Sequence, residues 1–161
     1  TQLKNWSSNQ SYVHTTLAGQ LALYLVMYSP LQMAADLPEH YEKYSDAFQF
    51  IKDVAVDWDD SKYIEAEPGD YITVARKAKG TDNWFIGGKC DENGHKAVIK
   101  LDFLDKGKTY ECTIYSDAAD ADYEKNPKAY SIIRKQVKRG DVLKINEARG
   151  GGFGVSLFVK K

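Results

Sequence analysis

The chain has 161 residues, a formal net charge of −1 and two cysteines, which suits one compact domain or one domain with part of another. A charge so close to neutral argues against a nucleic-acid binder, as does the absence of any basic run longer than "RKQVKR". The sequence contains no run of about 18 apolar residues, the length that a helix needs to cross a membrane. The first residues, "TQLKNWSSNQ", lack a starting Met and a signal-peptide pattern, so we expect a chain processed or cut from a longer protein.

The first third of the chain has few charges and a helical pattern. Residues 1–55 contain three Lys or Arg and five Asp or Glu, against nineteen and eighteen in the remainder. Thr15 or Thr16 can cap a helix that runs to about Tyr28 and is apolar on nearly every side, which predicts an enclosed helix. "PLQMAA" (30–35) is short and apolar on both faces, as a buried parallel strand is. "SDAFQFIKDV" predicts a second helix, amphipathic and capped by Ser45.

The rest of the chain alternates between apolar and polar residues. In "HKAVIKLDFL" the residues Ala97, Ile99, Leu101 and Phe103 share one face, as in a half-buried strand. Turn signals such as "EPGD", "DENGH" and "KRGD" separate the strand-like runs. The predicted strands are 62–66, 70–78, 84–90, 95–104, 109–116, 130–138, 141–147 and 153–159. Eight short antiparallel strands predict a β-sandwich or a barrel.

The two cysteines lie on predicted strands. Cys112 shares a face with Tyr110 and Ile114, and Cys90 shares one with Trp84. We expect two buried free thiols, and a disulfide stays possible. Two cysteines without a nearby His or Cys cluster make no structural zinc site.

Three parts of the chain resemble glycoside hydrolase family 97, which comprises α-glucosidases and α-galactosidases. They are "HTTLAGQLALYLVMYSPLQMAADLPEHYEK" followed by "AFQFIKDVAVDWDDSKYIEAEPGDYITVARK", then "NWFIGGKCDENGHKAVIKLDFL", and the closing "DADYEKNP…GGGFGVSL". The family has an N-terminal β-sandwich, a (β/α)8 barrel and a C-terminal antiparallel β-domain. The resemblance implies a mainly β chain: residues 1–55 as the last helix–strand–helix of the barrel, and 56–161 as a Greek-key-like β-sandwich.

The same resemblance implies what the longer protein does. It would hydrolyse α-glucosidic or α-galactosidic bonds in α-linked oligosaccharides, with a catalytic calcium ion, in a periplasm. Its catalytic carboxylates and calcium-binding glutamates would lie upstream, so no residue of this chain matches a catalytic or metal position and the chain alone should be inactive. Its partners would be the missing sandwich and barrel. Glucoside or galactoside specificity, and inversion or retention, stay open.

Asp36 and Gln32 are the candidate substrate-binding residues. Active sites of such barrels lie at the C-terminal ends of the strands, where Asp36 would be, and Gln32 has the same parity along the strand. The alternative is that Asp36 caps the following "LPEHY" turn by accepting backbone N–H bonds.

A carbohydrate-binding module without catalysis is the alternative function. Trp58 and Trp84 could stack on sugar rings, although Trp84 opens a strand with Ile86 on the same face, which favours packing in the core. A polar face would be expected on a linker helix, and the helix ending near Tyr28 has almost none.

Two further stretches could be read either as ligand sites or as ordinary loops and bends. "SDAADADYEKNP" contains four acids but lacks the Gly and the spacing of a calcium-binding loop, which favours a solvated loop. "RGGGFG" precedes no helix and no Lys-Ser/Thr pair, so its glycines indicate a bulge or tight bend before the last strand rather than a phosphate site.

Overall fold

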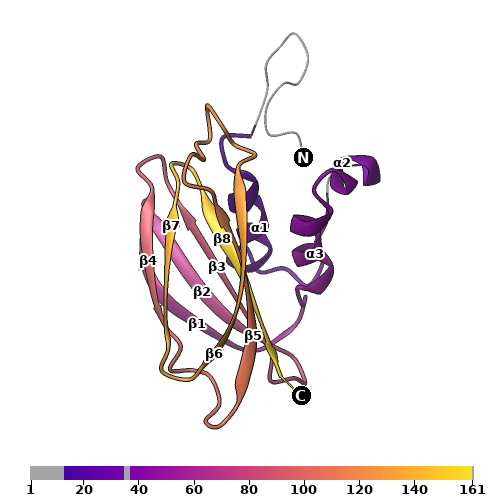
Figure 1. Ribbon diagram of the computed structural model, residues 1–161, viewed down its shortest axis with the longest axis vertical. Helices are drawn as coiled ribbons and strands as arrows, with labels where there is room; N and C mark the ends of the chain where they lie inside the picture. Colours follow the sequence, from indigo (N-terminus) through magenta and orange to yellow (C-terminus); the bar gives the residue numbers. More distant parts are fainter. Residues whose placement is uncertain (1–12, 35–36, 161) are drawn as a thin grey trace.

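The computed structural model describes residues 13–34 and 37–160, and within them the chain forms three helices and eight strands (Figure 1). The helices are α1 (Leu17–Val26), α2 (Pro38–Glu42) and α3 (Ser45–Asp53). The strands are β1 (Trp58–Glu67), β2 (Tyr71–Ala78), β3 (Trp84–Cys90), β4 (His95–Lys100), β5 (Thr109–Asp117), β6 (Tyr130–Lys138), β7 (Val142–Glu147) and β8 (Gly152–Val159). The eight strands predicted between residues 62 and 159 are all present, although β4 ends at Lys100 rather than at residue 104, and the mainly β fold is confirmed.

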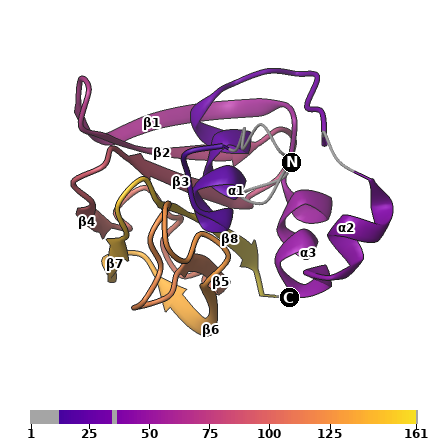
Figure 2. The ribbon, with the colours of Figure 1, turned by 90° about the horizontal axis from the view of Figure 1, so that it is seen from above.

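The strands of the described chain form two antiparallel sheets. The main sheet has the order β1-β2-β3-β8-β5-β6, and β4 pairs only with β7. The chain therefore leaves the main sheet after β3 and again after β6, and returns to it at β5 and β8. Seen from above, the β4–β7 pair lies on one side of the main sheet and α1 on the other (Figure 2).

The core between the two sheets consists of the alternating residues that the sequence pattern predicts. Ala97 and Ile99 of β4 and Leu143 of β7 are fully buried against Tyr110 of β5 and Leu157 of β8. Cys112 belongs to this core, and both cysteines are buried and free, as predicted. The burial of these side chains is the main stabilising term for the sandwich.

The other face of the main sheet is covered by α1 and α3. Leu21 and Leu25 of α1 and Phe50 of α3 form a second buried cluster with Phe85 and Tyr115 of the sheet. Helix α1 is therefore enclosed largely by the β-domain, against β3 and β8. The prediction that the helix is enclosed is confirmed for the face that carries Ala18, Gly19, Leu21, Ala22 and Leu25, which are buried.

The glycines of the sheet explain how the helices come so close. A Cβ at Gly87 would lie 2.7 Å from the Leu25 Cβ, and one at Gly152 would lie 3.1 Å from the Gly19 Cα. The "RGGGFG" glycines were predicted to allow a bend before the last strand. Gly150, with φ of +62°, fits that prediction. The glycines of β8, by contrast, leave room for the helices.

The start of the chain departs from the prediction in four places. No strand forms over 30–34, because no neighbouring strand of the described chain lies there to pair with it. Helix α1 ends at Val26, two residues before the predicted end, and α2 forms where a turn was predicted. The cap of α3 is Tyr44, without a side-chain bond, and Ser45 is inside the helix. Within the described ranges, no helix is long and apolar enough to span a membrane.

Candidate functional site at the two ends of helix α1

Helix α1 is attached to the β-domain at its first turn. The Thr16 hydroxyl accepts a hydrogen bond from Gly19 N at 3.0 Å, which confirms a threonine cap. Two backbone bonds then tie the helix start to distant loops: Thr16 N donates to Gly150 O at 3.3 Å, and Leu17 N donates to Pro127 O at 2.7 Å. The unpaired N–H groups at a helix start are thus partly satisfied by the β-domain.

A group of polar side chains lies near this first turn; it consists of the half-buried Lys89 and the buried Asp117 and Glu147, and we call it the polar cluster. Asp117 Oδ2 accepts hydrogen bonds from Ala148 N and Gly152 N, each at 2.9 Å. Lys89 Nζ donates to the carbonyls of Cys90, Gly150 and Gly151, at 3.1, 2.8 and 3.1 Å. The loop between β7 and β8 accepts a hydrogen bond from the start of α1, and the side chains of Asp117 and Lys89 therefore hold this loop in place.

Glu147 is the member of the polar cluster without such bonds. It is 5% exposed, and neither carboxylate oxygen has a hydrogen-bond partner among the described residues. Burial, followed by the charges of Asp117 and Glu65, raises the pKa of Glu147 to about 8. Burial also raises the pKa of Asp117 and lowers that of Lys89. The polar cluster thus favours a neutral Glu147.

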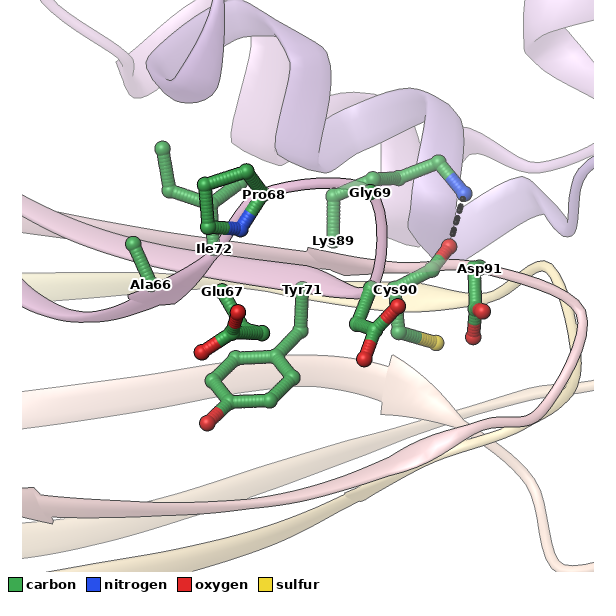
Figure 3. A pocket seen from close by; sticks show the side chains of 10 residues that line it. Ala66, Glu67, Pro68, Gly69, Tyr71, Ile72, Lys89, Cys90 and Asp91 are labelled. Carbon is green, nitrogen blue, oxygen red and sulfur yellow. Dashed lines mark hydrogen bonds between the residues drawn. The ribbon is translucent and has the colours of Figure 1, made fainter.

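A hollow of about 430 Å³ opens beside the polar cluster, at the turn between β1 and β2 (Figure 3). Tyr71 and the Cys90 thiol lie on one side of the sheet, and the Lys89 side chain extends along the other side (Figure 3). The Tyr71 ring stacks on His95, with centroids 3.7 Å apart. Burial raises the pKa of Cys90 to about 12, so its thiol is a poor nucleophile, and the Lys89 amine already binds three carbonyls. The Cys90 thiol and the Lys89 amine therefore provide no activated nucleophile in the hollow.

At the other end of α1, Arg76 of β2 binds the helix. Its Nε donates to Leu25 O at 2.8 Å and its Nη1 donates to Ser61 Oγ at 2.6 Å. The guanidinium also lies over the Tyr28 ring, 5.4 Å from the centroid. Helix α1 has no basic residue in its last turn, so Arg76 supplies the positive charge that a helix C-terminus favours.

The segment after α1, residues 27–34, contains the first candidate substrate-binding residue. The Gln32 side-chain amide donates to Ser29 O at 3.0 Å and to Met27 O at 3.4 Å, so it folds the segment back toward the helix end. Asp36 lies outside the described residues. Large apolar side chains on and just after this segment are exposed: Met27, Tyr28, Leu31, Met33 and Leu37.

The other residues singled out in the sequence are in ordinary positions. Trp84 is buried in the sandwich core, and Trp58 packs edge-on against Phe85, with centroids 5.9 Å apart. The acids of "SDAADADYEKNP" do not converge: Asp117 belongs to the polar cluster, whereas Asp122 accepts from the backbone N–H groups of Glu124 and Lys125. Across the described parts of the chain, no group of three or more His, Cys, Asp or Glu could hold a metal ion.

These features define a class of protein domain, a β-sandwich with helices packed on one face. An antiparallel β-sandwich holds a helix on its outer face, and the chain that leaves this helix exposes a series of large apolar side chains. The family profile described as "Glycosyl-hydrolase 97 C-terminal, oligomerisation" matches residues 57–158. The chain belongs to glycoside hydrolase family 97 and corresponds to the C-terminal portion of that family's proteins.

Similar proteins agree with this assignment. A retaining alpha-galactosidase of Bacteroides thetaiotaomicron is 32% identical over 88% of this chain, and a probable retaining alpha-galactosidase of Streptomyces bingchenggensis is 29% identical over 84%. The chain spans 21% and 20% of these two proteins. A family 97 enzyme of Pseudoalteromonas sp. strain K8, solved in complexes with panose and with acarbose, is 40% identical with a TM-score of 0.93. That likeness covers 98% of this chain and 25% of the solved one.

Proposed function

We propose that this chain is the supporting C-terminal part of an α-glycosidase that hydrolyses α-glucosidic or α-galactosidic bonds. The observation that carries the proposal is the likeness over 98% of this chain and only 25% of the solved family 97 chain. The galactosidase names of the curated relatives support α-galactosides as substrates. The panose and acarbose complexes of the solved enzyme support α-glucosides.

In this proposal the chemistry belongs to residues upstream of Thr1. Glycoside hydrolysis needs two carboxylates, about 5–5.5 Å apart for retention of configuration. The names of both curated relatives support retention. The polar cluster does not supply this pair, because Asp117 is engaged by two backbone N–H groups and Glu147 is buried.

We assign the calcium ion, the periplasmic location and the α-linked oligosaccharide substrate to the whole enzyme by family resemblance. The described carboxylates of this chain do not fit a metal site, so the calcium would be held by upstream residues. No step of the reaction is placed in the β-domain.

The contribution of this chain is to hold the end of the upstream barrel. Exposed Leu31, Met33 and Leu37 would be covered by that barrel, in which 30–35 would gain the strand neighbours that it lacks here. Gln32 and Asp36 would then lie at the barrel rim, toward the substrate. The alternative, a free carbohydrate-binding module, loses support because Trp84 is buried.

An assay of the parent enzyme, the longer protein that is proposed to contain this chain, tests this proposal directly. Purified parent enzyme should hydrolyse aryl α-glucosides or aryl α-galactosides, and proton NMR of the first product should show retained anomeric configuration. Asp36→Asn and Gln32→Ala should each raise KM if these residues contact substrate. No hydrolysis of either substrate would refute the proposed function, and unchanged KM and kcat in both variants would refute the contacts at the rim.

A further inference from the structure

We propose that Arg76 is a positioning residue for the reaction: it fixes the direction in which the chain leaves α1, and thereby the position of residues 27–34 at the rim of the upstream barrel. This inference rests on the proposed function. It goes beyond it because it assigns a part in catalysis to a residue in the middle of the β-domain.

The first reason is the hydrogen-bond requirement at the end of α1. The last carbonyls of a helix have no partner inside the helix, and a buried one without a partner is costly. Met27 N satisfies the Leu23 carbonyl, whereas Leu25 is fully buried and its carbonyl is satisfied by Arg76. The bond joins residues 51 positions apart, so it connects the helix end to β2 of the β-domain.

The second reason is that the same guanidinium holds three different elements. Arg76 is 5% exposed, and its planar fork contacts Leu25 at the helix end, Ser61 of β1, and the Tyr28 ring just beyond the helix. Tyr28 is 53% exposed, so little else of the β-domain holds its side chain. The direction of the chain after Val26 is therefore defined mainly by Arg76.

The third reason is that residues 27–34 make few other restraining contacts with the described residues of the chain. Ser29 and Gln32 make bonds within the segment, which fix its local shape but not its orientation on the domain. A longer contact, Tyr24 Oη to Met33 O at 3.5 Å, returns to α1 itself. If Arg76 is lost, the segment should keep its shape and change its orientation, and small displacements at a reacting site reduce rates strongly.

The experiment uses the parent enzyme with Arg76→Gln, Arg76→Lys and a control, Thr73→Val. Thr73 is fully buried on the same strand and donates one side-chain hydrogen bond, at 3.1 Å to Glu65, away from α1. We expect Arg76→Gln to reduce kcat/KM by about tenfold, and Arg76→Lys to recover part of this loss. Thr73→Val should retain the wild-type kcat/KM.

A second readout separates positioning from general destabilisation. Hydrogen exchange of the amides in 27–34 should become about tenfold faster in Arg76→Gln, while amides in β5 and β8 keep wild-type rates. Equal exchange of 27–34 in Arg76→Gln and Thr73→Val would overturn the proposal, as would faster exchange without any loss of kcat/KM. An inactive wild-type enzyme would refute the proposed function instead, since the exchange readout does not depend on activity.

Discussion

The Phe50 ring of α3 lies directly over the backbone of Gly154 in β8. A Cβ at Gly154 would be 2.7 Å from Phe50 Cζ, which is closer than side-chain carbons pack. Gly154→Ala should therefore destabilise the chain by about 1–3 kcal/mol, through overpacking. Thermal unfolding followed by circular dichroism measures this loss.

The double variant Gly154→Ala with Phe50→Leu provides the control for that prediction. Phe50→Leu removes the atoms that clash, so the cost of the alanine should be much smaller in this background. Additive losses in the double variant would show that the Phe50 contact is not the cause.

The raised pKa of Glu147 predicts that the stability of the folded chain falls as pH rises. Its pKa in the folded chain is raised to about 8, so folding favours the protonated acid. This contribution is complete below the unfolded pKa of about 4.3 and is lost as pH rises toward 8. Glu147→Gln, which is neutral at every pH, should be more stable than the wild type by roughly 1–3 kcal/mol at pH 8.

The pH series itself is the control for Glu147. The advantage of Glu147→Gln should shrink from pH 8 to pH 5, where the wild-type acid is also neutral. An advantage that stays constant with pH would indicate an effect of side-chain shape, and a less stable variant at pH 8 would contradict a neutral Glu147.

Asp117 should be far more important to stability than a neighbouring acid in the same acidic stretch. Removing its carboxylate leaves the half-buried Ala148 N–H and the buried Gly152 N–H without their acceptor, so Asp117→Ala should cost about 2–4 kcal/mol. Asp120→Ala removes one exposed bond to Asn126 and should stay within about 0.5 kcal/mol of the wild type. Urea unfolding of both variants makes the comparison, and similar losses would contradict the anchoring function of Asp117.

The two thiols should be inert in the folded chain. Burial raises the pKa of Cys90 to about 12 and that of Cys112 to about 11, and only the thiolate reacts. Iodoacetamide at pH 7.5 should label neither residue in the native chain and both after unfolding in urea, as measured by mass spectrometry. Labelling of either thiol at the same rate before and after unfolding would disprove this prediction.

Local alternation was sufficient to predict the eight strands of the sandwich, although it left a sandwich and a barrel both open. In "VLKINE" it places Leu143, Ile145 and Glu147 on one face, and all three are buried. The same pattern therefore contains a signal for Glu147, because it places an acid on the buried face of the strand. The Thr16 cap was predicted among two candidates because capping depends on residues only three positions apart.

Contacts between distant elements could not be predicted in this way. Arg76 lies within the predicted strand that contains "ITVARKA". Nothing in the neighbouring sequence indicates that its side chain binds the carbonyl of Leu25, on a helix in the first third of the chain. The strand predicted over 30–35 failed over its described part for a related reason: a parallel strand is stable only beside other strands. The boundary at residues 55 and 56 stays a prediction, although α1 and the main sheet share one buried cluster.

The most direct test of the account compares the 161-residue chain with its parent enzyme on the same aryl α-glycoside, at equal molar concentration. We expect turnover by the parent enzyme and none above background by the chain alone, because the catalytic carboxylates are proposed to lie upstream of Thr1. Hydrolysis by the purified chain at a rate comparable to that of the parent enzyme would contradict the account.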